Sequence, residues 1–289
     1  MLNDGEVKSI LSTSCKLGEG AYWDSTNNCF RFVDIKSNKI FRYDLVGETL
    51  IEFDAPEQCG FAFPISNNKL IVGLKSGLYS FSELSGEFTQ LLKTEPQYPN
   101  NRLNDATIGP DGAIWFGTMD DSESDKSGAF YRFDGALTLI DDNIAITNGP
   151  CFSPCGKFFY TVDTLGKLIF VWDMLGGAPT NKRLFADLND QKGFADGPVC
   201  DSQGNVWIGL FFGWGVRVYS PKGALLGVIE LPVSNITKIA FGGDDLKTVF
   251  VTTAKVGLNE AQLSEQPLAG NIFTFRSKIA GFALPKIVL

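Results

Sequence analysis

Four acidic or amide residues occupy the same position in a repeated pattern of this chain: Glu19, Asn104, Asn148 and Asp196. The last three each stand eight residues before a glycine in a turn sequence (PDG, SPCG or DSQG). Equivalent positions of a repeat point to equivalent places in a fold, so we expect the four side chains to converge. Carboxylate and amide oxygens suit hard divalent cations, and the pattern therefore predicts a site for one such ion.

A second interpretation of these residues is purely structural. Asn-Gly, Asp-Gly and Asn-Asp are common turn dipeptides, because Asn and Asp tolerate left-handed backbone conformations. Burying charged or amide groups without partners costs several kcal/mol, however, and a cation would remove that cost for all four at once. Glu19 and Asp196 would also balance a 2+ charge. Calcium, manganese, magnesium, zinc and iron(II) all stay open as the ion.

The chain contains no histidine. This excludes Ser-His-Asp and Cys-His catalysis, zinc sites with histidine ligands, and acid–base chemistry by imidazole. Catalysis must then depend on carboxylates, amides, Lys, Tyr or a bound metal ion.

The elements that position these residues form a sixfold repeat of two apolar strands joined by a small-residue turn. The second strand of each copy ends on an aromatic residue, and these residues lie roughly 38 to 56 positions apart, the period of a four-stranded propeller blade. The pattern predicts an all-β protein, a six-bladed β-propeller formed by residues 1–289 as a single domain. The closing aromatic residues are Tyr43, Phe81, Phe133, Trp172, Tyr219 and Phe275.

The strand order also predicts which turns share the face of the polar ring. If the innermost strands begin at that face, the turns after the next strand return to it. Two of them, 119–128 and 255–270, are longer than a tight hairpin needs, and long loops on a rigid scaffold often determine specificity. The aromatic residues Phe211, Phe212 and Trp214 belong to another of these turns and are candidates for a pocket wall.

Composition limits the partners and the location. The chain has 25 Lys and Arg against 33 Asp and Glu, a net charge of -8, so we expect no nucleic-acid or membrane partner. The N-terminal sequence MLNDGEVKSI lacks the pattern of a signal peptide, which predicts a cytoplasmic protein. The six cysteines are then expected to be reduced thiols. Nothing in the chain indicates its oligomeric state.

Four segments resemble the gluconolactonase, regucalcin and sugar-lactonase family: LGEGAYWD, NNRLNDATIGPDGAIWFGTM, ITNGPCFSPCGKFFYTVDT and ADGPVCDSQGNVWIGL. The resemblance extends over nearly the whole chain, and stretches such as LPVSNITK are similar to bacterial xylonolactonase- or arabinonolactonase-type enzymes. It implies a six-bladed propeller that holds one divalent cation and hydrolyses an aldonolactone to the aldonic acid. A pentonolactone such as xylonolactone or arabinonolactone is the expected small-molecule substrate.

The resemblance also implies roles for individual residues. It matches Glu19, Asn148 and Asp196 to metal ligands, and Arg102 and Asn104 to substrate contacts. An acidic substrate contact falls on Asp120 or on Asp121, since the register there is open. We further expect Asp196 to act as the catalytic proton acceptor.

Three other functions stay open at this stage. A phosphotriesterase-like propeller would use a similar oxygen-ligated cation on a phosphoester. A non-enzymatic calcium-binding or scaffold propeller would keep the fold without turnover. A strictosidine-synthase-like propeller would lack this set of oxygen ligands.

Overall fold

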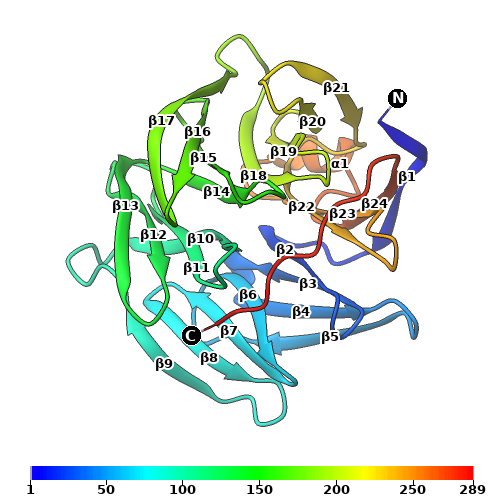
Figure 1. Cartoon of the computed structure of the whole chain (residues 1–289). Helices are drawn as coiled ribbons and strands as arrows, with labels where there is room; N and C mark the ends of the chain where they lie inside the picture. The colour runs from blue at the N-terminus through cyan, green and yellow to red at the C-terminus, as the bar shows by residue number, and fades with distance from the viewer. Residues whose placement is uncertain (1, 289) are drawn as a thin grey trace.

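The computed structural model describes residues 2–288 and shows six four-stranded antiparallel sheets arranged in a ring (Figure 1). The innermost strands are β2 (Gly18–Asp24), β6 (Cys59–Ser66), β10 (Asn101–Ile108), β14 (Thr147–Phe152), β18 (Phe194–Cys200) and β22 (Ile236–Gly242). The second strands are β3 (Cys29–Asp34), β7 (Lys69–Leu74), β11 (Ile114–Asp120), β15 (Phe158–Asp163), β19 (Val206–Phe211) and β23 (Thr248–Thr253).

The outer half of each blade completes the sheet. The third strands are β4 (Lys39–Asp44), β8 (Gly77–Ser82), β12 (Gly128–Phe133), β16 (Leu168–Leu175), β20 (Gly215–Tyr219) and β24 (Ile272–Ser277). The outermost strands are β5 (Thr49–Asp54), β9 (Phe88–Lys93), β13 (Leu137–Ile144), β17 (Ala178–Asp187), β21 (Leu225–Glu230) and β1 (Asn3–Leu11). The predicted all-β, six-bladed propeller is therefore confirmed.

The ring is closed by the N-terminal strand. β1 pairs antiparallel with β24 and supplies the outer strand of the sixth blade, whose other strands come from the end of the chain. The first blade begins only at β2, which explains why the repeated sequence pattern starts after residue 11. Closure in this way ties the N-terminal segment, which leads directly into the first blade, to the last blade by backbone hydrogen bonds.

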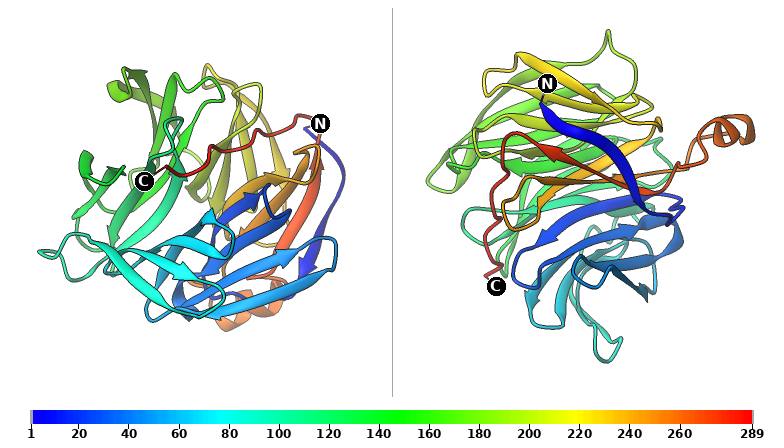
Figure 2. Two further views of the ribbon diagram at one scale, coloured as in Figure 1. Left: turned by 60° about the horizontal axis from the view of Figure 1, so that its bottom comes forward. Right: turned by 90° about the vertical axis from the view of Figure 1, so that its right-hand side faces the viewer.

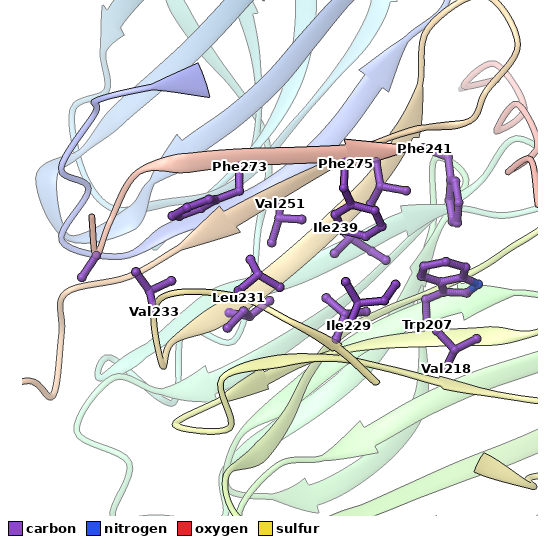
Figure 3. Packing of buried hydrophobic residues seen from close by; sticks show 14 residues of the cluster. Trp207, Val218, Ile229, Leu231, Val233, Ile239, Phe241, Val251, Phe273 and Phe275 are labelled. Atoms are coloured by element: carbon purple, nitrogen blue, oxygen red, sulfur yellow. The ribbon is translucent and has the colours of Figure 1, made fainter. Parts of the chain in front are cut away.

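Burial decreases from the centre outward. The strands β2, β10, β14 and β22 are buried along their whole length, whereas β5 is exposed or partly exposed throughout. All six closing aromatic residues are buried in third strands, as the repeat predicts. The spaces between blades are filled by apolar side chains; between blades 5 and 6, Trp207 meets the ring of Phe241 edge-on at 5.2 Å (Figure 3). Burial of each such side chain contributes about 1.5–3 kcal/mol.

The two faces of the ring differ. On one face the C-terminal segment, residues 278–288, crosses the molecule, with Gly281 N–H donating to Leu246 O and Val288 N–H donating to Gly112 O (Figure 1). On the other face the loop 255–270 projects and includes the short helix α1 (Glu260–Glu265), capped by Asn259 and Gln262 (Figure 2). A single 3-10 turn, η1 (Ile35–Ser37), joins β3 to β4. Among residues 2–288, no helix has the length and apolar character needed to cross a membrane.

Candidate active site

In three innermost strands, β2, β14 and β18, an irregularity directly follows a side chain that faces the centre of the ring. The pairing of β2 with β3 shifts register directly after Glu19, that of β14 after Asn148 and that of β18 after Asp196. In all three the next residue is a glycine with positive φ: Gly20 at 60°, Gly149 at 74° and Gly197 at 36°. A β-bulge of this kind reorients the neighbouring side chain, and only glycine adopts such angles without strain.

The four residues at the predicted register line one cavity at the face opposite the C-terminal segment. Blade 1 supplies Glu19, blade 3 Asn104, blade 4 Asn148 and blade 5 Asp196, and all four are at least 95% buried. The predicted substrate contact Arg102 lines the same cavity. The corresponding positions of blades 2 and 6, Cys59 and Thr237, do not belong to the lining.

The two carboxylates are incompletely paired. Glu19 Oε2 accepts a hydrogen bond from Gly20 N–H and Asp196 Oδ1 accepts one from Gly197 N–H, both at 2.9 Å. Within residues 2–288, Glu19 Oε1 and Asp196 Oδ2 accept none. Burial and the nearby Asp105 carboxylate raise the pKa of Glu19 from 4.5 to about 7. Burial and the charge of Glu19 likewise raise the pKa of Asp196 well above its usual value.

The two amides are held in one orientation by a chain of hydrogen bonds. Asn104 Nδ2 donates to Asn148 Oδ1 at 2.9 Å and to Thr147 O at 2.7 Å. Asn148 Nδ2 donates to Thr164 Oγ1 at 2.9 Å, and that hydroxyl donates to Ala195 O at 3.1 Å. Because its amino group is held by Thr164, Asn148 presents its oxygen toward the other ring residues.

Arg102 is held at the cavity by a carboxylate from the 119–128 loop. Its Nε donates to Asp121 Oδ1 at 2.8 Å and its Nη1 to Asn104 Oδ1 at 2.6 Å. Asp121 also accepts from Lys36 and Gln58, so it joins blades 1, 2 and 3. Burial opposes ionisation of Asp121, but these hydrogen bonds and the Arg102 charge keep its pKa below the usual value.

Asp120, the other carboxylate left open by the register, is used inside its loop. Its Oδ2 accepts from Ser122 Oγ at 2.6 Å and from the N–H groups of Ser124 and Asp125. These hydrogen bonds, the one from Ser122 first, lower its pKa. Neither Asp120 nor Asp121 lines the cavity. Asp121 is ion-paired with Arg102, which does line it, and Glu123 is the acidic residue of this loop in the lining.

Sequence reasoning missed three residues of this site. Asp105 and Lys238 form a buried ion pair next to the carboxylates, and Thr164 orients Asn148. Asp105 directly follows Asn104, where an Asn-Asp dipeptide looks like a turn signal. Thr164 follows Asn148 by 16 residues and carries no signal of its own in the sequence. Lys238 does carry one, since it is a lysine inside the innermost apolar strand ITKIAFG.

The rim of the cavity has two different sides. Blades 1 and 3 contribute charged groups, including Lys36 and Glu123, while blades 4 to 6 contribute Leu165, Phe211 and Phe212 among the apolar residues. The rings of Phe211 and Phe212 meet edge-on at 4.7 Å. As predicted, these residues come from the turns that return to this face. Trp214 is 44% exposed and does not belong to the lining.

The donor set is of a kind that hard divalent cations accept. Residues 2–288 contain no group of three or more His, Cys, Asp or Glu side chains arranged for a metal ion. The site instead combines two carboxylates with an amide oxygen, a set typical of oxygen-ligated cations. The two carboxylate oxygens without protein donors belong to buried side chains that line the cavity, and a 2+ ion held by Glu19, Asn148 and Asp196 would place a positive charge opposite them.

A six-bladed propeller with an oxygen-lined central cavity is a recognised class of protein, and sequence comparison identifies the family. The chain belongs to the SMP-30/Gluconolactonase/LRE-like family, whose model matches residues 17–255. It is 34% identical to the L-arabinolactonase of Azospirillum brasilense, covering 96% of this chain and 94% of that protein. It is 29% identical to regucalcin of Bos taurus, with 98% and 96% covered.

A solved structure agrees with this assignment. The calcium-binding protein regucalcin from Agrobacterium tumefaciens superimposes with a TM-score of 0.94 at 27% identity, covering 98% of this chain and 97% of that one. The family predicted from the sequence motifs is therefore confirmed, together with its fold.

Proposed function

We propose that this protein is a metal-dependent hydrolase that opens a sugar lactone to the corresponding aldonic acid, with a five-carbon aldonolactone as substrate. As a family member related to lactonases along its full length, the protein is a lactone hydrolase. The observation that supports metal dependence is the pair of buried carboxylates, Glu19 and Asp196, each with one oxygen that accepts no hydrogen bond within residues 2–288. The L-arabinolactonase relative favours a pentonolactone.

The proposed ion would be bound by Glu19, Asn148 and Asp196, and Asn104 would assist. Such a cation supplies Lewis-acid polarisation of a carbonyl oxygen. Its identity among calcium, manganese, magnesium, zinc and iron(II) is left to experiment, since one oxygen-rich site accepts several of these.

The protein's own groups would handle the protons. In lactone hydrolysis, water adds to the carbonyl carbon, the ring C–O bond breaks, and the released ring oxygen becomes a hydroxyl. We assign Asp196 as the group that accepts the proton of the attacking water, because Oδ2 is free of protein donors and the chain has no histidine. The same carboxyl would return the proton to the departing ring oxygen.

Arg102 and Asn104 would hold the substrate. Arg102 Nη2 makes no hydrogen bond within residues 2–288, whereas its other nitrogens are bonded to Asp121, Leu103 and Asn104. It can therefore donate to a sugar hydroxyl from a fixed position. Asp121 would act on the substrate through Arg102, and Asp120 would stabilise the loop. The charged and apolar sides of the rim would select the ring and its hydroxyl stereochemistry.

A second candidate function is calcium binding without turnover. The solved relative described as a calcium-binding protein favours it, and the same three ligands would serve both functions. A phosphotriesterase-like activity would also use these ligands. We propose a cytoplasmic location, which the six free cysteines favour.

The test is lactone hydrolysis after chelation. D-xylono-, L-arabinono- and D-gluconolactone and a phosphotriester are compared while calcium, manganese, magnesium, zinc and iron(II) are added back singly. We expect activity to be lost with the chelator and restored by one ion, with a pentonolactone fastest. Rates no higher than spontaneous ring opening, with an ion still bound by calorimetry, would favour the binding protein instead.

Two variants test the assignment of roles. Asp196→Asn removes both a ligand and the proton acceptor, and we expect a loss of about 1,000-fold or more in kcat. Arg102→Met removes a donor to the substrate, and we expect mainly a higher KM. Equal losses of kcat in the two variants would contradict the division of roles.

A further inference from the structure

A buried ion pair crosses the centre of the ring beside the proposed ligands. Lys238 Nζ on β22 donates to Asp105 Oδ1 on β10, so the pair connects blades 6 and 3. The lysine side chain is 6% exposed and the aspartate side chain 1%. Lys238 also lines the cavity at the opposite face, under the C-terminal segment, and therefore separates that cavity from the ligands. Neither residue has a role in the reaction proposed above.

The pair lies against the backbone beside two of the ligands, and the residue next to Lys238 contacts the backbone beside the third. Asp105 Oδ2 accepts a hydrogen bond from Gly149 N–H, directly after Asn148, at 3.0 Å. A Cβ built on Gly197, directly after Asp196, would lie 2.8 Å from Lys238 Cβ, so these two backbones are in close contact. Next to Lys238, Thr237 Oγ1 donates to Gly18 O at 2.6 Å, directly before Glu19.

The net charge that surrounds the proposed ion depends on the Asp105–Lys238 pair. Three buried carboxylates meet here, those of Glu19, Asp105 and Asp196, and the Lys238 ammonium is their buried cation. Arg102 and Lys36 both pair with Asp121, and the carboxylate of Glu123 lines the same cavity, so these two cations and two carboxylates add no net charge. The group therefore has two negative charges when fully ionised. Interactions between charges are strong in such a dry environment, because there is little water to screen them.

We propose that Lys238 sets the charge of the ion that this site prefers: by neutralising Asp105 it leaves two negative charges, which match a divalent cation and disfavour a trivalent one. This inference rests on the cation of the proposed function. It predicts that loss of the lysine charge leaves a surplus negative charge that favours a 3+ ion, and that loss of the Asp105 charge has the opposite effect.

The experiment measures two affinities on the intact chain, for Ca²⁺ by calorimetry and for Tb³⁺ by its luminescence. The proteins are the wild type, Lys238→Met, Asp105→Asn and the double variant. The quantity compared is the ratio of the Tb³⁺ affinity to the Ca²⁺ affinity, because a ratio does not depend on the fraction of molecules that fold. Arg31→Met is the matched control, since Arg31 is a buried cation paired with Asp24 and Glu83 away from this site.

A single neighbouring charge commonly changes the equilibrium of an ionic group about tenfold or more for each unit of charge on that group. Tb³⁺ and Ca²⁺ differ by one unit, so we expect the ratio of the Tb³⁺ affinity to the Ca²⁺ affinity to rise about tenfold in Lys238→Met. In Asp105→Asn it should fall by a similar factor, and in the double variant and in Arg31→Met it should stay near the wild-type value. The opposite sign expected for Asp105→Asn preserves the test if Lys238→Met does not fold.

The outcomes separate this inference from the proposed function. Ratios that stay unchanged in both single variants, with ions still bound, would overturn the role of Lys238 and leave the metal site intact. Equal changes in Arg31→Met would also overturn it, because they would show a general effect of destabilisation. No binding of either ion by the wild type would overturn the proposed metal site and this inference with it.

Discussion

Replacing Thr164 by valine tests whether the orientation of Asn148 determines cation binding. Thr164 is 6% exposed, and its hydroxyl accepts from Asn148 Nδ2 at 2.9 Å and donates to Ala195 O at 3.1 Å. Valine has nearly the same shape, so the substitution removes both hydrogen bonds while little packing is lost. The amide of Asn148 then loses the acceptor of its nitrogen and is oriented only by the hydrogen bond that its Oδ1 accepts from Asn104 Nδ2.

The size of the effect follows from the two hydrogen bonds. Each is worth about 0.5–1.5 kcal/mol net, so the pair contributes about 1–3 kcal/mol. Part of this is lost from folding stability and part from ion binding. Residues that orient a metal ligand typically change affinity by about 10- to 100-fold, and we expect about tenfold weaker Ca²⁺ binding for Thr164→Val.

The assay is a calorimetric Ca²⁺ titration with a melting curve for each protein. Thr164→Ser is the matched control, because it keeps the hydroxyl and removes only the methyl group, and we expect it to bind within about threefold of the wild type. Two results would refute the reasoning. One is Thr164→Val binding as tightly as the wild type; the other is a serine variant as weak as the valine variant, which would attribute the effect to packing.

Two further predictions concern pH and the thiols. The pH prediction concerns the metal-free protein, kept so by a chelator. Burial and the Asp105 carboxylate raise the pKa of Glu19 from 4.5 to about 7, so the Glu19 carboxyl binds its proton more tightly in the folded state than in the unfolded chain. The resulting stability, on the order of 3 kcal/mol, is present below pH 4.5 and lost as the pH rises through 7. Urea titrations across that window should show it, and Glu19→Gln should remove most of it; an identical pH dependence in both proteins would contradict the prediction. For the thiols, a thiol reagent should modify one cysteine of the folded protein quickly, Cys155, since it is the exposed one, and all six after denaturation. Fewer than six in denaturant would reveal a disulfide.

Much of the fold is encoded in local patterns. The closing aromatic residues, such as Trp172 and Phe275, mark third strands because each blade must bury the same face against its neighbour. The part that local patterns did not reveal is the closure of the ring by β1. That strand pairs with β24, more than 250 residues away, and its own residues are mostly exposed or partly exposed. No local periodicity distinguishes such a strand.

The candidate site, like the fold, was predicted from the sequence only in part. Glu19, Asn104, Asn148 and Asp196 were found from sequence because a repeat turns equal register into equal position in space. The sequence left Asp120 and Asp121 as alternatives for the acidic substrate contact. In the structure Asp120 accepts hydrogen bonds from its own loop, whereas Asp121 accepts one from Arg102.

The sequence by itself determined the class of fold, the family and the four polar residues that line the central cavity, because all three depend on residue types repeated at a regular spacing. Only the tertiary structure decided which groups lie next to that ring. Asp105 and Lys238 are 133 residues apart and come from blades 3 and 6, which face each other across the centre. Their meeting depends on how the six blades close, and closure is a property of the whole ring rather than of any one repeat.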